Sequence, residues 1–296
     1  MSSHGERINV YSVPVRPVNT NAPIGALLVD SGKITQEEAD RVMRLQREKG
    51  LRFGDAAIKL GLIIPADIER ALSQQFEFPY LIPGTSSLSG ELVAAYVPFD
   101  RKVEVFKAIR SQLMLRWFNL DLGIKHLAIV SPCRREGRSY FAANLAVVFS
   151  QLGERTLLID ADMRNPRQHA MFNLDNRAGL STLLAGRAET GLIEHIVPFV
   201  DLSILPAGPV PPNPQELLGR PLFRNLLADL AKEFDVIILD TPAGGTNADA
   251  QTIATRAGGA FTVARRHHTS ARALKTLSAQ LVGTGVTLIG AVINTV

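Results

Sequence analysis

The sequence predicts an α/β protein with a doubly wound, mostly parallel sheet and a small, mostly helical N-terminal domain. From residue 126 onward, short runs rich in Val, Ile and Leu alternate with amphipathic segments of helical length. Continuous apolar runs are typical of parallel strands covered on both faces, and regular strand–helix alternation is typical of doubly wound sheets. Closer to the N-terminus, apolar residues follow a helical period within a repeated segment, which indicates a separate helical module.

The composition fits a globular protein and excludes several other classes. The chain has 296 residues, of which 46% are hydrophobic and 20% are charged. No apolar run has the ~18–20 residues that cross a bilayer, and the N-terminus lacks the apolar core of a secretory signal. The single cysteine, Cys133, favours a reducing compartment, the cytoplasm. The net charge of +4 suits phosphate-bearing ligands, an anionic membrane face or nucleic acid, and does not choose among them.

The N-terminal part of the chain contains an internal repeat. Its two copies, Pro23–Gln46 and Arg52–Gln75, share two glycines and a closing glutamine at a constant spacing of 29 residues. Each copy predicts a short helix that ends at a glycine, followed by a second amphipathic helix. We therefore expect a helical domain over residues 23–80, preceded by a flexible tail over residues 1–22. Residues 81–98 are rich in Pro, Gly and Ser and are predicted to be a linker.

The C-terminal part, residues 99–296, is predicted to form the α/β domain. A helix is expected from Lys102 to about Phe118. The predicted buried strands are residues 126–131, 156–160, 202–207, 235–240, 259–264 and 287–294.

The first predicted strand leads into a loop, from Ser131 to Ser139, with features of a phosphate-binding loop. A strand, a loop that ends in Gly-basic-hydroxyl and a helix are the context in which backbone N–H groups hold phosphate oxygens. Gly137 lets the backbone approach a phosphate, and Ser139 would place its hydroxyl on Mg²⁺. The pattern G-x-x-x-x-G-K-[ST] is incomplete, because Pro132 stands at the first glycine and Arg138 replaces the lysine. The loop alone is equally consistent with a plain turn between a strand and a helix.

Acidic residues follow two further predicted strands. Asp160 and Asp162 come at the end of one strand, and Asp240 comes at the end of another. Taken singly, the first two could cap a helix and the third could be a turn residue. Ligands of open α/β sheets bind at the carboxyl ends of the strands, where acids can hold Mg²⁺ or orient an attacking hydroxyl. Together with the loop, these acids predict a nucleotide site.

Three segments give the sequence a specific resemblance. LLIDADMRNP, DVIILDTPAG and the loop ending in EGRS resemble the bacterial tyrosine kinase family, within it the chain-length-determinant kinases of the EpsG type. That family belongs to the Min/Par-type branch of P-loop NTPases. The resemblance implies an ATP-dependent protein-tyrosine kinase that regulates exopolysaccharide biosynthesis and chain length, with ATP and Mg²⁺ as cofactors and tyrosine as the acceptor.

The resemblance also implies roles for individual residues. Catalysis would involve Arg138 in place of the usual lysine, Asp160, Asp162 and Asp240. Mg²⁺ would be held by Ser139, Asp160 and Asp240. The nucleotide would be bound by Arg135, Glu136, Gly137, Arg138, Ser139, Tyr140 and Asn294, the last of which resembles an adenine-contacting asparagine. Subunit contacts in a homo-oligomer would involve Glu104, Lys107 and Arg110.

The sequence departs from the family pattern at several positions. Cys133 stands where Min/Par ATPases carry an extra lysine, which favours the kinase branch. Arg138 keeps the charge of the usual lysine but is larger and planar, so either slow activity or a loop of different shape is expected. Lys107 replaces the middle arginine of the subunit-contact helix, so a bidentate contact is not expected there. No tyrosine cluster precedes Val296, so autophosphorylation of such a cluster is not expected; the tyrosines are Tyr11, Tyr80, Tyr96 and Tyr140.

The resemblance further implies partners and a location. The family predicts a membrane-embedded, Wzz-like chain-length determinant as activator and no nucleic-acid partner. The kinase is then expected to be cytoplasmic, held at the inner face of the plasma membrane by that activator. A second hypothesis is a non-kinase ATPase switch that controls polysaccharide assembly.

The N-terminal repeat is similar to a different family, the N-terminal domain of type II secretion and pilus ATPases. Some of those domains bind cyclic di-GMP through an Arg-Leu-Gly start and a closing glutamine in each copy. Arg52, Gly54 and Gln75 fit this pattern in the second copy, whereas the first copy lacks the arginine. Cyclic di-GMP binding that gates the C-terminal domain, or protein docking, are the two expectations for this repeat.

Overall fold

The computed structural model describes residues 23–65, 67–68, 71–72, 79–82, 84–119, 123–187, 191–197 and 199–295. The predicted tail and Gln75 lie outside the described residues. The chain divides into two compact units, Met1–Phe78 (unit 1) and Pro79–Val296 (unit 2). Each unit is described by itself.

Unit 1 reproduces the repeat of the sequence in its backbone. Its described helices are α1 (Ile24–Asp30), α2 (Gln36–Lys49) and α3 (Phe53–Lys59). The turns after α1 and α3 are the same, since Gly32 and Gly61 both have φ of 69°. Thr35 and Glu38 form a capping box at the start of α2, which satisfies two N–H groups of the first turn. The unit is held together by a small apolar core that includes Leu28, Val42, Ala57 and Ile63.

Unit 2 begins with the segment that its composition predicted to be a linker, and this prediction is wrong. Leu81, Leu92, Ala94 and Ala95 are buried in the core of unit 2. The buried side chain of Asn144 binds the segment, accepting from the Ala94 N–H at 2.9 Å. The short helix α5 (Val93–Tyr96) lies here. Pro, Gly and Ser therefore mark turns of a packed segment rather than a spacer.

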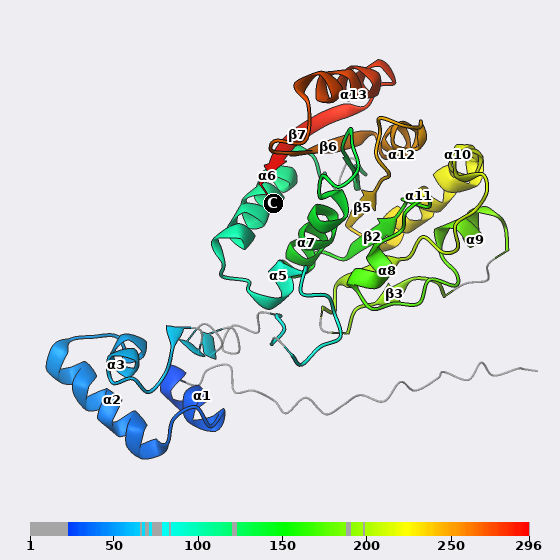
Figure 1. The fold of residues 1–296 in the computed structure, drawn as a ribbon. Coiled ribbons are helices and arrows are strands. Elements are labelled where there is room, and N and C mark those ends of the chain that lie inside the picture. The colour runs from blue at the N-terminus through cyan, green and yellow to red at the C-terminus, as the bar shows by residue number, and fades with distance from the viewer. Residues whose placement is uncertain are drawn as a thin grey trace, which may run out of the picture. The chain divides into compact units, whose positions relative to one another are not determined.

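The described residues of unit 2 form a seven-stranded sheet in the order β3-β4-β2-β5-β1-β6-β7 (Figure 1). All neighbouring strands are parallel except β3 and β4. The strands are β1 (His126–Val130), β2 (Thr156–Asp160), β3 (Glu194–His195), β4 (Leu202–Leu205), β5 (Val236–Asp240), β6 (Gly259–Arg265) and β7 (Thr287–Asn294). Every predicted strand is present, whereas β3 was missed because two exposed polar residues carry no strand pattern.

Helices cover both faces of this sheet (Figure 1). On one face lie α5, α6 (Arg101–Arg116), α7 (Arg138–Ser150) and α8 (Gln168–Met171). On the other lie α9 (Leu180–Leu184), α10 (Pro214–Gly219), α11 (Pro221–Glu233), α12 (Asp249–Ala257) and α13 (Ala271–Gly283). Strand residues alternate between the two cores: Leu127 and Ile129 belong to the first, Ala128 and Val130 to the second. This period of two fixes which face of each strand meets which helices.

In the part of the chain that the structure describes, no helix combines the length and the hydrophobicity required to cross a bilayer.

Candidate functional site

The loop between β1 and α7 has the backbone of an anion-binding nest. Arg135 and Gly137 both adopt left-handed conformations, with φ of 62° and 93°. Such alternation turns successive N–H groups to the same side and makes a concave site for an anion. The N-terminus of α7 starts at Arg138 directly after the loop and adds its free N–H groups. Glycine is favoured at position 137 because a residue with a Cβ is strained at this φ, and a Cβ there would also press against the Asn294 side-chain amide.

Arg138 lies inside the site, and the Nε and Nη1 atoms of its guanidinium donate hydrogen bonds. Nε donates to the carbonyl of Thr241 at 2.8 Å, and Nη1 donates to the carbonyl of Cys133 at 2.7 Å and to the Ser131 hydroxyl. Nη2 lies 4.0 Å from Asp162 Oδ2. The side chain is buried and braces the loop against the end of β5. Its fork therefore satisfies loop acceptors and also places a positive charge beside the acids.

Asp160 and Asp240 face each other at the carboxyl ends of adjacent strands. They are direct partners in the register of β2 and β5, and both are fully buried. Asp160 Oδ2 accepts from the N–H groups of Arg167 and Gln168, each at 2.9 Å. Ser139, in the first turn of α7, lies near the Asp240 carboxyl and acts to lower its pKa. The structure brings these three side chains together, and their roles toward metal and nucleotide stay a prediction.

Gln168 joins the loop to the acids. Its Nε2 donates to Asp240 Oδ2 at 2.8 Å and to the carbonyl of Ser139 at 3.1 Å. The residue is fully buried at the start of α8. Gln168 could not be predicted from the sequence, because a single glutamine eight residues after Asp160 belongs to no recognisable pattern. We refer to Asp160, Asp240, Ser139 and Gln168 as the acidic cluster.

Burial shifts the protonation of both aspartates. Burial and the charge of Asp240 raise the pKa of Asp160 well above its ordinary value of 3.8. Burial likewise raises the pKa of Asp240 to about 6, against the opposing effects of Arg138 and of the Ser139 and Gln168 hydrogen bonds. Two carboxylates this close resist ionising together unless a cation joins them.

Three buried oxygens of the acidic cluster have no hydrogen-bond partner among the described residues: Asp160 Oδ1, Asp240 Oδ1 and Gln168 Oε1. A buried polar atom without a partner is unfavourable, so such atoms in a native fold require an explanation. No group of three or more His, Cys, Asp or Glu residues that could hold a metal occurs in the described parts of the chain. These three oxygens fit the coordination of a hard cation that brings waters or phosphate oxygens as further ligands, as Mg²⁺ does.

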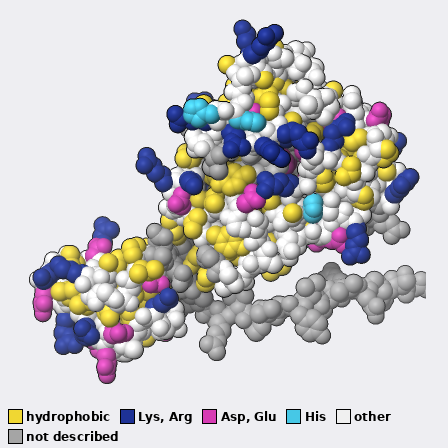
Figure 2. All heavy atoms as spheres, in the orientation of Figure 1, with side chains coloured by type: hydrophobic (Ala, Val, Ile, Leu, Met, Phe, Trp, Pro, Cys, Tyr) yellow, Lys and Arg dark blue, Asp and Glu magenta, His cyan; other side chains and the backbone are white. Residues whose placement is uncertain are grey.

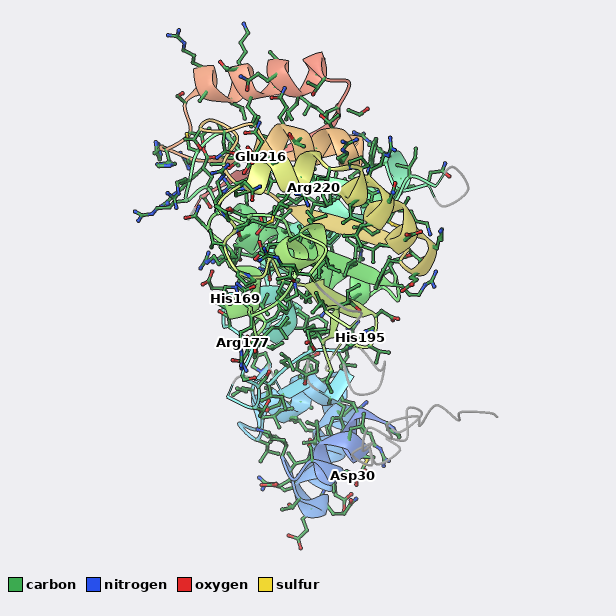
Figure 3. The ribbon with its side chains drawn as sticks, turned by 90° about the vertical axis from the view of Figure 1, so that its right-hand side faces the viewer. Asp30, His169, Arg177, His195, Glu216 and Arg220 are labelled. Carbon is green, nitrogen blue, oxygen red and sulfur yellow. The ribbon has the colours of Figure 1, made fainter. Side chains whose placement is uncertain are left out.

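Asp162 lies at the rim of the acidic cluster, with 5% of its surface exposed. Its Oδ1 accepts from the N–H groups of Arg164 and Asn165, at 3.2 and 2.9 Å. Arg164 in turn forms a two-bond ion pair with buried Asp249 at the start of α12, with Nε 2.6 Å from Oδ2. The negative charge of Glu216 in α10 also helps to raise the pKa of Arg164. In the view of Figure 3, Glu216 lies above His169 of α8. This ion pair could not be predicted from the sequence, because Arg164 and Asp249 lie 85 residues apart in the chain.

The carboxyl edge of the sheet is strongly basic. Figure 2 shows Lys and Arg side chains, together with histidines, gathered over the upper part of the face that it views. Such a surface attracts polyanions and raises their rate of association. The exposed arginines that follow the ends of β1, β2 and β6 are Arg134, Arg135, Arg164, Arg167 and Arg266.

Asn294 and Tyr140 were also predicted to bind the nucleotide, and they lie in different surroundings. Asn294, at the end of β7, donates from Nδ2 to the carbonyl of Glu136 at 3.2 Å and so reaches the loop. Tyr140 packs edge-on against Phe106 with ring centroids 6.0 Å apart, and burial raises the pKa of its hydroxyl. Tyr140 thus contributes to the packing of α7 against α6.

The residues predicted for subunit contacts make contacts within this chain. Lys107 Nζ lies 2.7 Å from Glu104 Oε1 on the same helix, α6. Arg110 Nη1 donates to the carbonyl of Val148 in α7 at 2.7 Å, and burial lowers the pKa of Arg110. Arg110 therefore anchors α6 to α7, and a role of these residues between subunits stays a prediction.

The predicted cyclic di-GMP residues are only partly described. Arg52 is the N-cap residue of α3, and Gln75 lies outside the described residues. Gly54 has a packing role, since a Cβ there would lie 2.5 Å from Ile68 Cδ1. Binding of this nucleotide stays a prediction.

The fold and site together define the class of protein. A parallel sheet with a nest between β1 and α7, and acids at the ends of β2 and β5, is the architecture of P-loop nucleotide-binding proteins. The solved structure of the cell-division ATPase MinD from Pyrococcus furiosus shares this fold, with a TM-score of 0.51 and 24% identity over 58% of this chain and 72% of that chain. No family model matches the sequence.

Sequence and structural relatives identify the family within this class. CapB from Staphylococcus aureus, which bears the name of a tyrosine-protein kinase, is 36% identical over 191 residues, covering 64% of this chain and 83% of CapB. The kinase domain of the Escherichia coli tyrosine kinase ETK superposes with a TM-score of 0.66 and 30% identity, covering 71% of this chain and 82% of that domain. The chain belongs to the bacterial tyrosine-protein kinase family. The expected kinase is thereby confirmed, and the non-kinase switch is not favoured.

Proposed function

We propose that this chain transfers the γ-phosphoryl group of ATP to tyrosine hydroxyls of proteins that act in exopolysaccharide biosynthesis and chain-length control. One observation carries the proposal: a phosphate-type nest shares the carboxyl edge of one sheet with three buried oxygens of the acidic cluster that have no hydrogen-bond partner in the described parts of the chain. The pairing suits a nucleotide whose phosphates enter the nest while its cation meets the acids. The names of the family's members supply the acceptor, tyrosine.

The nest would bind the triphosphate. The N–H groups of residues 135–139 and the α7 N-terminus would hold the phosphate oxygens. Arg138 would add positive charge at the base of the nest, after exchanging part of its bonds to Ser131 and Cys133. Mg²⁺, when bound, supplies charge neutralisation of the phosphates. Ser139, Asp240 and Asp160 are the residues that would hold it, directly or through water.

Asp162 would contact the hydroxyl of the acceptor tyrosine. Each of the two aspartates has one oxygen that accepts two N–H groups, but Asp160 is fully buried whereas Asp162 keeps 5% of its surface exposed and has its Oδ2 4.0 Å from Arg138. A carboxylate there can orient the tyrosine hydroxyl and accept its proton as the bond to phosphorus forms. Little further chemistry is required, since phosphoryl transfer depends mainly on positioning and charge stabilisation.

We also propose a setting for this activity. The resemblance to chain-length-determinant kinases supports a cytoplasmic enzyme that a membrane-embedded, Wzz-like protein holds at the plasma membrane. The same resemblance supports a homo-oligomer. Co-purification of the chain with that membrane protein from detergent extracts, and its loss from membranes when the partner is deleted, would test this setting.

The kinase proposal is tested with the full chain, labelled ATP, Mg²⁺ and a random Glu–Tyr copolymer as acceptor. We expect label on tyrosine, and a loss of at least about 100-fold for Asp240→Asn. Asp229→Asn is the matched control, since Asp229 is an exposed acid of α11 paired with Lys232, and it should behave as the parent. Hydrolysis of ATP without any phosphotyrosine, in the presence of the membrane partner, would overturn the proposal in favour of a switch.

A further inference from the structure

We refer to residues 131–139, from the end of β1 to the first turn of α7, as the phosphate loop. Three consecutive backbone carbonyls of this loop each accept a hydrogen bond from a side chain of another segment. The carbonyl of Arg134 accepts from His268 Nε2 at 3.1 Å, and that of Arg135 accepts from Arg265 Nη1 at 3.2 Å. The carbonyl of Glu136 accepts from Asn294 Nδ2 at 3.2 Å. The donors come from two other segments of the chain, the end of β6 with its following turn and the end of β7.

The same turn also holds the loop through a buried carboxylate. Glu136 is fully buried, and its Oε2 accepts from the Cys133 N–H at 2.6 Å while Oε1 accepts from the Thr269 hydroxyl. Thr269 is itself fixed, since its oxygen accepts from the Arg265 N–H at 2.7 Å. The turn after β6 and the phosphate loop are thus one hydrogen-bonded body.

These contacts determine where the loop N–H groups point. In a planar trans peptide the C=O and the following N–H point in opposite directions. Holding the carbonyls of residues 134–136 outward therefore aims the N–H groups of residues 135–137 at the concave side. Arg135 needs this support, because a left-handed backbone is unfavourable for any residue with a Cβ. Such a conformation persists where surrounding contacts over-determine it.

We propose that Arg265 and His268, with Asn294, form a carbonyl clamp that keeps the phosphate loop in its anion-binding conformation. The inference rests on the proposed nucleotide function and assigns positioning roles to residues outside the loop. Each clamp residue must donate, because a carbonyl only accepts. For His268 this requires a proton on Nε2. Asn294 would thus serve the loop, in addition to any contact with the base.

The clamp predicts a specific kinetic signature. A loop that is no longer held in place loses nucleotide affinity, whereas the acids and Arg138 that act in transfer stay where they are. Removing one partly exposed donor should weaken nucleotide binding by about three- to tenfold. The kcat at saturating ATP should change by no more than about threefold. A general loss of structure would instead lower kcat and thermal stability together.

The experiment measures binding of a fluorescent ADP analogue with Mg²⁺ to the full chain, alongside KM for ATP. Arg265→Met and His268→Leu remove the donors and retain much of the side-chain volume, and both should weaken binding as stated. His268→Gln retains a donor and should bind within about twofold of the parent. Arg272→Gln and His267→Asn are matched controls, being exposed neighbours whose side chains make no hydrogen bond within the described residues, and should bind as the parent does.

Distinct outcomes separate this inference from the proposed function. Parent-like binding by folded Arg265→Met and His268→Leu would overturn the clamp and leave the kinase proposal intact. Binding by His268→Gln as weak as that of His268→Leu would also overturn it, since shape rather than hydrogen bonding would then matter. A parent that binds nucleotide but never phosphorylates tyrosine would overturn only the kinase proposal. A parent that binds no nucleotide would overturn both.

Discussion

The phosphate loop and the acidic cluster meet at one edge of the sheet, yet they differ in how their polar groups are satisfied. In the loop, three carbonyls, the Glu136 carboxylate and the Arg138 guanidinium all have partners. In the cluster, buried oxygens of Asp160, Asp240 and Gln168 have none among the described residues. The loop therefore has its conformation before any ligand binds, whereas the cluster contains oxygens whose coordination only a bound cation would complete.

This difference separates stability from function. Contacts in the loop should favour both the fold and nucleotide binding, because the same hydrogen bonds do both. The charges in the cluster should oppose folding and favour function, because buried carboxylates are unfavourable until a cation reaches them. Substitutions in the two regions should therefore change the free energy of unfolding in opposite directions.

The largest effect is expected for Asp160→Asn. Phosphoryl transfer should fall by at least about 100-fold, while the free energy of unfolding of the nucleotide-free protein should rise by about 1–3 kcal/mol. Asparagine can still accept the N–H groups of Arg167 and Gln168 through its oxygen, so only the buried charge is lost. Urea denaturation and the kinase assay measure the two effects. A variant that is both inactive and less stable would contradict the contrast between loop and cluster.

The opposite sign is expected for Glu136→Gln in the loop. Both oxygens of Glu136 accept hydrogen bonds, from the Cys133 N–H and the Thr269 hydroxyl. Glutamine has the same shape but sets an NH₂ group against one of these donors. The free energy of unfolding should fall by about 1–3 kcal/mol, and nucleotide affinity should fall with it. Denaturation with and without Mg-ADP checks both, and a stabilised variant would show that this carboxylate belongs with the cluster.

The pH dependence of stability should come from the cluster. Because folding raises the pKa of Asp240 from 3.8 to about 6, its protonated form stabilises the fold below pH 4, and this stability is lost as the pH rises through 6. Between pH 5 and pH 7.5 the nucleotide-free protein should lose about 1 kcal/mol from this group. The slope should flatten in Asp240→Asn and reverse with Mg-nucleotide, which selects the ionised form. Denaturation series at several pH values, with the parent and variant paired, isolate this group.

Much of this contrast, though not all of it, was predictable from the sequence. Carboxyl ends of parallel strands converge, so Asp160 and Asp240 could be placed together from their strand positions alone. The role of Gln168 depends on the path of the chain from β2 to α8, and the role of Thr269 depends on how the turn after β6 meets the loop. Neither path is encoded in local spacing. The same reason explains the linker error, since turn residues hid the buried Leu92.

Sequence repeats were the most reliable signal in unit 1. The helices α1 and α3 start 29 residues apart, as the aligned glycines predicted. Local turn chemistry determines this spacing, whereas the site in unit 2 assembles from segments more than 100 residues apart, such as Arg138 and Thr241. Local elements were therefore easier to predict than the contacts that complete the site.

The smallest effect, and the sharpest test of the boundary between the two regions, is expected for Arg138→Lys. Arg138 belongs to the loop through its bonds to Cys133 and Thr241, and to the cluster through its charge beside Asp162. An ammonium keeps the charge but cannot span the same acceptors with a rigid fork. The free energy of unfolding should fall by about 1 kcal/mol, while the rate of transfer at saturating ATP stays within about threefold of the parent. Arg138→Met, which lacks the charge, is the control and should lose transfer as well. If lysine instead lowers the rate as much as methionine does, the planar fork itself acts in catalysis, and Arg138 is part of the reacting site rather than its brace.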